Sequence, residues 1–380
     1  MKLSKVEKKE IIEAISKNIA ESLQNFILCN IKELIRQENL PAITNNGETM
    51  WFDDLIKLKI ESSVSENTRR GYAGFRRYFL RRYGRGPLLS EVNQRFTNLF
   101  VCNAMEDYKD APATLHLIIS RYNALINLGR SEGYISSLFR FVYPRHGFVS
   151  ADHNLTFDEL SHIFDAFQIA FSKDTLVRKP VTRALGIFIL DIALQGLAPV
   201  DMSLLKIKSL RFGVETLGDG SEIKVLSVNT LRKKTGNPVS IVTSLRGIGD
   251  FVKALTAGKS EDDYLIPCFD PEKSYTDGQR QNRLSNYFNR TSAFLNKAMK
   301  AYYKEMGLGE PRRISYYFAR HAFCNLVDSL DIPRHLIQHM VGHRSTVLEK
   351  SYLRAISVKE QAEISDRMLS QFFRGGTNQT

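Results

Sequence analysis

Residues 316–352 open with Tyr316-Tyr-Phe-Ala-Arg-His-Ala-Phe323, continue through Met340-Val-Gly-His343 and close at Tyr352. Nearly every segment after residue 285 has apolar side chains at helical spacing, which predicts helices throughout this part of the chain. Gly342 should end the helix before His343, because glycine is common just beyond a helix end. The pattern therefore predicts a helical C-terminal third in which His343 lies at a helix terminus.

Upstream of this stretch, the chain is expected to form a buried helix, a turn and a short second helix. Residues 181–194 are largely apolar, which predicts the buried helix. Gly196-Leu-Ala-Pro199 predicts a turn. A short helix should then run from residue 200 to residue 210, with Pro199 near its start.

The hydrophobic period changes after this helix. The β-branched runs at residues 223–229 and 239–243 are separated by Thr235-Gly-Asn-Pro238, which predicts a small antiparallel sheet. Helical patterns fill most of the remaining sequence. The predicted fold class is therefore mainly α with a small antiparallel β-sheet.

Two turn-rich segments divide the chain. One amphipathic helix is predicted over residues 5–38, and Asn45-Asn-Gly47 predicts a linker after it. A second linker is expected at Pro144-Arg-His-Gly147. The predicted organisation is a helical arm, a helical domain, a larger α+β domain and a tail helix, at residues 1–45, 46–148, 149–357 and 358–380.

The composition excludes several classes of protein. Hydrophobic residues make up 43% and charged residues 25%, a mix typical of a globular chain. The strongly apolar stretch 184–190 is far shorter than the roughly 20 residues of a membrane span. The four cysteines form no Cys-x-x-Cys pair, which argues against zinc knuckles and for a reducing compartment.

The charge balance favours a polyanionic partner. Lys and Arg number 53 against 41 Asp and Glu, a net charge of +12. The most basic segment lies between Glu66 and Glu91, where no acidic residue occurs. Core packing is the preferred interpretation of its helical aromatic stripe, which consists of Tyr72, Phe75, Phe79 and Tyr83. Phosphate contact is the preferred interpretation of its arginines, namely Arg69, Arg70, Arg76, Arg77 and Arg81.

The motifs together resemble the tyrosine recombinases, or phage-type integrases. That family carries Arg-His on a helix, a Gly-His turn and a nucleophilic Tyr nine residues after that His, as do Arg320, His343 and Tyr352. It also carries a Lys before Thr-Gly on a β-hairpin, a position that Lys234 matches. The resemblance extends over about residues 46–357, and the arrangement around Gly196 is most similar to integrases of mobile elements in Bacteroides-type bacteria.

The resemblance assigns a role to each matching residue. Tyr352 would attack phosphorus and form a 3′-phosphotyrosine, which stores the energy of the broken phosphodiester. Arg320 would hold the non-bridging oxygens with its guanidinium fork. His343 would contact a phosphate oxygen or assist proton transfer. Lys234 would protonate the departing 5′-oxygen, with its neighbours Lys233 and Arg232 as less favoured alternatives.

Two positions depart from the family pattern. The family usually has His three residues before the motif arginine, where this chain has Tyr317, which can still donate a hydrogen bond. The first family arginine is replaced by Ala198, and Gln195 occupies the place where some relatives carry an arginine instead. Three cations could substitute for the missing arginine: Lys206, Arg232 and Arg183.

The resemblance implies a site-specific recombinase that acts on double-stranded DNA. Four protomers would hold two duplexes, exchange strands through a Holliday junction and use no metal or nucleotide cofactor. Because of Ala198 and Tyr317, a non-catalytic or degenerate DNA-binding protein of the same fold is the alternative function.

A metal site is a second, less favoured alternative. His335, His339 and His343 are spaced by four residues, as ligands on one helix face might be. Gly342 should interrupt that helix, however, and no Glu follows His335 as a zinc-protease motif requires. The sequence therefore predicts no metal ligand.

Overall fold

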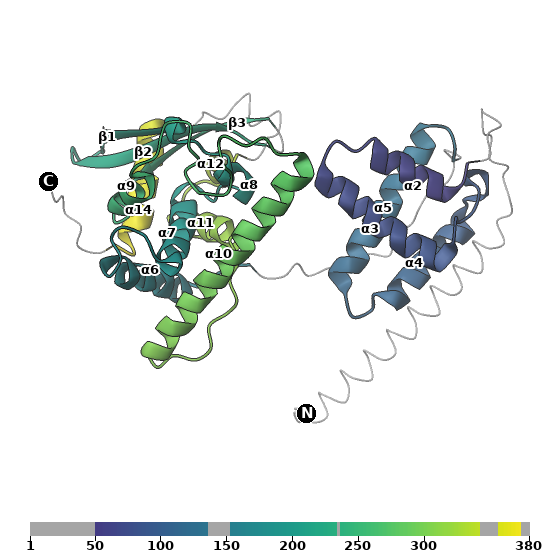
Figure 1. Cartoon of the computed structure of the whole chain (residues 1–380), viewed down its shortest axis with the longest axis horizontal. Helices are drawn as coiled ribbons and strands as arrows, with labels where there is room; N and C mark the ends of the chain where they lie inside the picture. Colours follow the sequence, from purple (N-terminus) through teal and green to yellow (C-terminus); the bar gives the residue numbers. More distant parts are fainter. Residues whose placement is uncertain (1–49, 136–152, 234–235, 343–355, 374–380) are drawn as a thin grey trace, which may run out of the picture. The chain divides into compact units, whose positions relative to one another are not determined.

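The computed structural model describes residues 50–135, 153–233, 236–342 and 356–373, and Figure 1 shows the elements that they form. The chain divides into two units, residues 1–150 and 151–380, and each is considered by itself. The predicted arm at residues 1–45 lies outside the described residues, so it stays a prediction. Among the described helices, none is long and apolar enough to cross a membrane.

The first unit is built around a cluster of aromatic side chains. Its helices are α2 (Phe52–Glu61), α3 (Glu66–Tyr83), α4 (Gln94–Asp107) and α5 (Pro112–Ser131), with a short 3₁₀ turn at Leu89–Glu91. Phe79 stacks on Phe52 with 4.8 Å between the ring centroids, and Phe100 stacks on Tyr122 at 4.1 Å. All four rings are buried, and Tyr72 and Phe75 of α3 are buried with them. The predicted core role of the aromatic stripe is confirmed for Tyr72, Phe75 and Phe79, and Tyr83 is partly buried against the same cluster.

Helix α7 (Pro180–Ala193) lies at the centre of the second unit. Every residue from Ala184 to Ala193 is buried, which confirms the predicted buried helix. Three helices pack against it, namely α6 (Phe157–Ser172), α10 (Asp277–Glu305) and α11 (Tyr317–Asp328). Gly186 permits one close approach, because a Cβ there would lie 2.2 Å from the ring of Phe251 on α9 (Gly249–Thr256).

Three antiparallel strands form the sheet of the second unit. They are β1 (Leu210–Thr216), β2 (Glu222–Leu231) and β3 (Pro238–Ser244), in the order β1-β2-β3. Val228 of β2 pairs with Leu210 on one side and with Ile241 on the other. Helix α14 (Val358–Ser370), yellow in Figure 1, packs against β3. The predicted fold class, mainly α with a small antiparallel sheet, is confirmed.

The prediction of a helix from residue 200 to residue 210 is wrong after Ser203. Helix α8 spans only Pro199–Ser203, and a 3₁₀ turn at Ile207–Ser209 leads into β1. Tertiary contacts compete with the helix, because the Leu265 N–H donates to the Leu205 carbonyl at 2.7 Å. Strand β1 lies at the edge of the sheet, and its Phe212 and Val214 are 54% and 56% exposed. Leu210, Phe212 and Val214 nevertheless alternate along this strand, a spacing typical of β-structure that the prediction missed.

Candidate active site

Arg320 on α11 connects two segments that are distant from it in the sequence. Its Nη1 donates to the carbonyl oxygen of Gly196 at 2.9 Å, and its Nη2 donates to the carbonyl oxygen of Val341 at 2.8 Å. Gly196 follows the end of α7, and Val341 follows α12 (Arg334–Met340). The arginine with the strongest predicted role therefore lies where these two helix ends meet.

The turn after α7 is tightly built around this arginine. Gln195 and Gly196 both have φ at 61°, in the left-handed region that favours glycine. The Gly196 N–H donates to the carbonyl of Asp191 at 2.9 Å. A Cβ on Gly196 would lie 2.4 Å from the Cα of Arg320. Only glycine at this position lets α11 approach the turn so closely.

Arg232 brings a second guanidinium to the same carbonyl. It follows β2 directly, and its Nη2 also donates to the Val341 carbonyl oxygen. Burial and then the positive charge of Arg320 lower the pKa of Arg232, while Asp201 acts in the opposite direction. Both arginines stay protonated, because arginine keeps its charge in proteins. Two like charges thus meet at one point, an arrangement that an anion would stabilise.

The end of the β2–β3 hairpin is tied to α8. Oδ1 of the buried Asp201 accepts a hydrogen bond from the backbone N–H of Lys233 at 2.8 Å. Ala198 caps α8, and its carbonyl accepts from the N–H groups of Asp201 and Met202 at 2.8 and 2.9 Å. Asp201 therefore fixes the end of the hairpin beside the turn that contains Ala198.

A buried carboxyl group lies beneath the turn. Asp191 on α7 is only 1% exposed, and burial raises the pKa of its carboxyl well above the usual range. The positive charge of Arg320 and a hydrogen bond from the Leu197 N–H act in the opposite direction. Asp191 belongs to none of the sequence motifs, so its place beside the turn emerges only from the tertiary structure.

The three cations proposed as substitutes for the missing arginine have different surroundings. Lys206 pairs with Asp262, with 3.2 Å between Nζ and Oδ1. Nη2 of Arg183 donates to the carbonyl of Val177 at 3.1 Å. Of the three, Arg232 is the one that the structure brings to the same carbonyl as Arg320.

Gln195 and Tyr317 take no part in the convergence on Val341. The side chain of Gln195 is buried and donates to Gln361 on α14. Tyr317 begins α11 and is 51% exposed, with its ring packed edge-on against His321 and His153 at centroid distances of 4.9 and 5.3 Å. In the part of the chain that the structure describes, its hydroxyl forms no hydrogen bond.

Three predicted catalytic residues, Lys234, His343 and Tyr352, lie outside the described residues. Their assignment therefore stays a prediction. Lys233 and Gly342, the chain neighbours of the first two, belong to the site. A Cβ on Gly342, whose φ is 64°, would lie 2.5 Å from Nε of Arg232. His343 is also one member of the histidine triplet, so the structure does not test that metal alternative.

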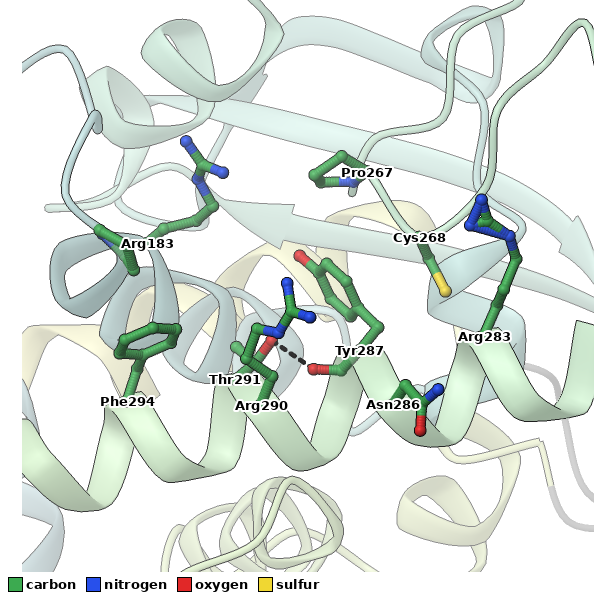
Figure 2. Close-up of a pocket in the computed structure, with 10 residues that line it drawn as sticks. Arg183, Pro267, Cys268, Arg283, Asn286, Tyr287, Arg290, Thr291 and Phe294 are labelled. Atoms are coloured by element: carbon green, nitrogen blue, oxygen red, sulfur yellow. Dashed lines mark hydrogen bonds between the residues drawn. The ribbon is translucent and has the colours of Figure 1, made fainter.

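A cavity of about 510 Å³ between α7 and α10 contains a second group of arginines. Arg183 comes from α7, and Arg283 and Arg290 come from α10. Figure 2 shows Arg283, Tyr287 and Arg290 extending from α10 toward the side of the cavity that holds Arg183 and Pro267. Within the described ranges, no carboxylate oxygen lies within 4.0 Å of these three guanidinium groups. The sequence alone could have indicated this second group of arginines, because α10 has no acidic residue between Asp277 and Glu305.

The predicted DNA-binding arginines of α3 fall into two groups. Arg76 forms a two-pronged ion pair with the buried Asp53 of α2, at 2.6 and 2.9 Å. Arg69 and Arg70 lie near Glu66 at 3.7 and 3.0 Å. Two others, Arg77 and Arg81, are exposed, and neither has a carboxylate partner among residues 50–135. Part of this basic face is thus paired, by Glu66 of α3 itself and by Asp53 of the neighbouring helix α2, which the local pattern of α3 does not show.

No protein-family model matches the chain, and no curated protein matches it. Among solved structures, a Tn1549 transposon integrase in complex with transposon right end DNA matches with a TM-score of 0.53 and 15% identity. The match covers 85% of this chain and 99% of the integrase chain.

Two further structures match with lower scores. A lambda integrase tetramer bound to a Holliday junction has a TM-score of 0.49 and 17% identity, over 89% of this chain and 86% of that chain. XerH site-specific recombinase bound to difH substrate has a TM-score of 0.48 and 14% identity, over 84% and 95%. The Tn1549 match carries the conclusion on the fold: this chain has the fold of the tyrosine-recombinase integrases.

Proposed function

We propose that this chain is a site-specific DNA recombinase that cuts and rejoins DNA strands through a 3′-phosphotyrosine intermediate. The observation that carries the proposal is the convergence of Arg320 and Arg232 on the Val341 carbonyl, directly before Gly342 and His343. Two guanidinium forks held in one place fit the non-bridging oxygens of a phosphodiester. The Tn1549 likeness supports the proposal at the level of the fold.

The proposed reaction keeps its energy in a covalent bond. The hydroxyl oxygen of Tyr352 forms a bond to phosphorus and loses its proton, and His343 assists that transfer. The bond from phosphorus to the 5′-oxygen breaks, and Lys234 gives this oxygen a proton. Attack by a 5′-hydroxyl then reverses these steps on a new strand. Arg320 and Arg232 stabilise the negative charge that develops on the non-bridging oxygens in both directions.

We infer that Arg232 takes over the role of the first family arginine, whose position in this chain is occupied by Ala198. Nε of Arg232 is buried, and it has no hydrogen-bond partner among the described residues. A buried N–H donor without an acceptor lowers the stability of the fold, unless a bound ligand supplies the acceptor. A bound phosphodiester would supply the missing acceptor and would also offset the repulsion between the two arginines. Tyr317 would contribute a hydroxyl donor from the first turn of α11.

The proposed partner is double-stranded DNA held by four protomers. Arg77 and Arg81 of α3 supply unpaired positive charge in the first unit, and the arginines of α10 supply it in the second. By the resemblance stated above, the element mobilised is of the Bacteroides type and the reaction takes place in the bacterial cytoplasm. The alternative is a DNA-binding protein of the same fold that performs no cleavage.

Covalent capture separates the two functions. A duplex nicked close to the scissile phosphate lets the cut fragment diffuse away, so a recombinase remains attached to the 3′ end. We expect the wild-type chain to form a complex that survives detergent, in EDTA as well as in buffer. The EDTA arm tests the proposed use of arginine and lysine in place of a metal. Binding without capture would favour the non-catalytic alternative, and capture that requires added zinc or magnesium would favour a histidine-bound metal.

Removal of the two unpaired arginines of α3 should weaken DNA binding equally for all sequences. Each phosphate contact adds about 0.9 to the slope of log K against log salt, so Arg77→Ala with Arg81→Ala should reduce that slope by about 1.8. Binding measured at several salt concentrations tests this expectation. An unchanged slope would show that these side chains face solvent in the complex.

Arg76→Ala is the matched control for this measurement. Its partner Asp53 has a side chain only 3% exposed, and Arg76 holds the pKa of this carboxyl below its usual range. Loss of Arg76 leaves a buried carboxylate without its main partner and should lower the free energy of unfolding by roughly 1–3 kcal/mol. The salt slope should stay at the wild-type value, because this arginine is already neutralised.

A further inference from the structure

Gln361 on α14 connects the C-terminal helix to the turn that holds Arg320. The side chain is 4% exposed, and its Oε1 accepts two hydrogen bonds. One comes from Nε2 of Gln195 at 2.8 Å, and the other comes from the backbone N–H of Val242 on β3 at 3.1 Å. A single side-chain oxygen therefore joins α14, the sheet and the turn after α7.

The turn that receives this bond has an unfavourable backbone conformation. Gln195 has φ at 61°, which costs free energy for a residue with a Cβ and persists only where its surroundings hold it. Its side chain is 2% exposed, and the bond to Gln361 is its one hydrogen bond among the described residues, because its Oε1 has no partner there. Gln361 thus supplies the polar contact that holds Gln195.

The effect of this contact should reach the guanidinium of Arg320. Gly196 comes directly after Gln195, and its carbonyl oxygen accepts from Nη1 of Arg320 at 2.9 Å. A rotation of the peptide between Gln195 and Gly196 would shift the backbone that carries this carbonyl. The path from α14 to the arginine therefore consists of one side-chain hydrogen bond, one peptide and one backbone acceptor.

We propose that Gln361 is a positioning residue that sets the orientation of Arg320 through Gln195 and the turn after α7. The proposal rests on the proposed recombinase function, because the orientation of Arg320 matters for chemistry at a phosphodiester. Helix α14 begins six residues after Tyr352, so the helix that positions the arginine follows the proposed nucleophile closely in the chain.

A purely structural role for α14 is the competing explanation, and the same helix offers a control for it. Ser365 is also buried, and its Oγ bonds to Oγ1 of Thr243 at 2.7 Å and to the N–H of Ser244 at 3.1 Å. These bonds attach α14 to β3, as Gln361 does, but they do not include the turn after α7. Ser365→Ala should therefore loosen the helix without moving Arg320.

Three variants at the Gln361–Gln195 bond separate the two roles. Gln361→Met keeps the shape of the side chain and removes the acceptor. Gln361→Glu keeps the acceptor oxygen, and the N–H groups of Gln195 and Val242 that donate to it can stabilise the charge of the new carboxylate. Gln195→Gly removes the bond from the other side while glycine accepts the left-handed backbone, so this variant protects the test against a failure to fold.

Single-turnover cleavage, DNA binding and thermal unfolding are measured for each variant. We expect Gln361→Met to slow cleavage by about 10- to 100-fold with DNA affinity unchanged, because a misplacement of about 1 Å can cost 10²-fold. Gln195→Gly should slow cleavage less, because glycine adopts the left-handed backbone without the contact that holds Gln195. Gln361→Glu should recover most of the rate. Ser365→Ala should lower the unfolding temperature and cleave at the wild-type rate. Wild-type cleavage by Gln361→Met, or equal slowing in Ser365→Ala, would overturn the proposal.

Amide hydrogen exchange provides a readout that does not depend on cleavage. Residues 195–198 should exchange faster in Gln361→Met than in Ser365→Ala, since only the first variant releases the turn. If the wild-type chain gives no covalent complex, the recombinase function fails, and the exchange data alone decide whether Gln361 holds the turn. Equal exchange in the two variants would refute the positioning role in either case.

Discussion

Tyr352→Phe should abolish covalent capture on a nicked duplex while duplex binding stays close to that of the wild type. The change removes only the hydroxyl that attacks phosphorus, and many backbone contacts shared across the interface determine affinity. Capture is read as a band that survives detergent on a denaturing gel, and binding is read by a mobility shift with the same duplex.

Tyr317→Phe is the matched control for this variant. Tyr317 is 51% exposed and lies three residues before Arg320, so it is the described tyrosine best placed to be mistaken for the nucleophile. The Tyr317→Phe variant should still form the covalent complex, with at most a slower rate from loss of a donor. Capture by Tyr352→Phe together with no capture by Tyr317→Phe would reverse the assignment.

The second large effect is expected from Arg232. Loss of one positioned donor to a developing negative charge costs about 2.7–4 kcal/mol, or roughly 10²–10³ in rate. Arg232→Ala should therefore slow single-turnover cleavage by about that factor with binding intact. Arg232→Lys should recover only part of the rate, because lysine keeps the charge without the planar fork.

The other two candidate cations serve as controls for Arg232. Lys206→Ala breaks a pair with Asp262, and Arg183→Ala removes a bond to the Val177 carbonyl, so neither change should alter the cleavage rate. Ala198→Arg should not raise activity in the wild-type chain, because Arg232 already supplies the second guanidinium beside Arg320. Faster cleavage by Ala198→Arg, combined with no effect of Arg232→Ala, would mean that the first arginine position is vacant.

The sequence predicted those parts of the fold that carry a strong periodic pattern. The apolar run in α7 and the β-branched runs of β2 and β3 form the elements that were expected. Strand β1 was missed although Leu210, Phe212 and Val214 alternate as strand residues do, and the helix predicted up to residue 210 was wrong because contacts with residues 261–265 end it earlier. Long-range hydrogen bonds decide such segments, and local spacing does not record them.

The sequence likewise predicted one part of the candidate site and missed another. Motif spacing was sufficient to single out Arg320, but three cations remained as candidates for the missing arginine. Arg232 and Val341 are 109 residues apart, so only the tertiary structure could bring them together. The bond between Gln195 and Gln361 spans 166 residues and has no signature in either segment. The pairing of Arg76 with Asp53 was likewise hidden, because its acidic partner comes from another helix.

The chemistry also distinguishes the recombinase from its non-catalytic alternative. A protein that only binds DNA needs distributed positive charge, and exposed arginines such as Arg77 and Arg81 supply that without further precision. Non-specific binding does not require two guanidinium groups that are directed at one carbonyl, one of them also bonded to a turn with positive φ. Arg232 and Arg320 therefore favour the catalytic function over the alternative.

The most direct test of the central claim is to identify the residue that carries the DNA in the covalent complex. The wild-type chain is captured on a nicked duplex in EDTA, digested with protease and nuclease, and analysed by mass spectrometry. The account predicts one modified peptide, with the 3′-phosphate of the cleaved strand on the oxygen of Tyr352. A phosphate on any other residue, or no adduct under conditions where the chain binds its duplex, would contradict it.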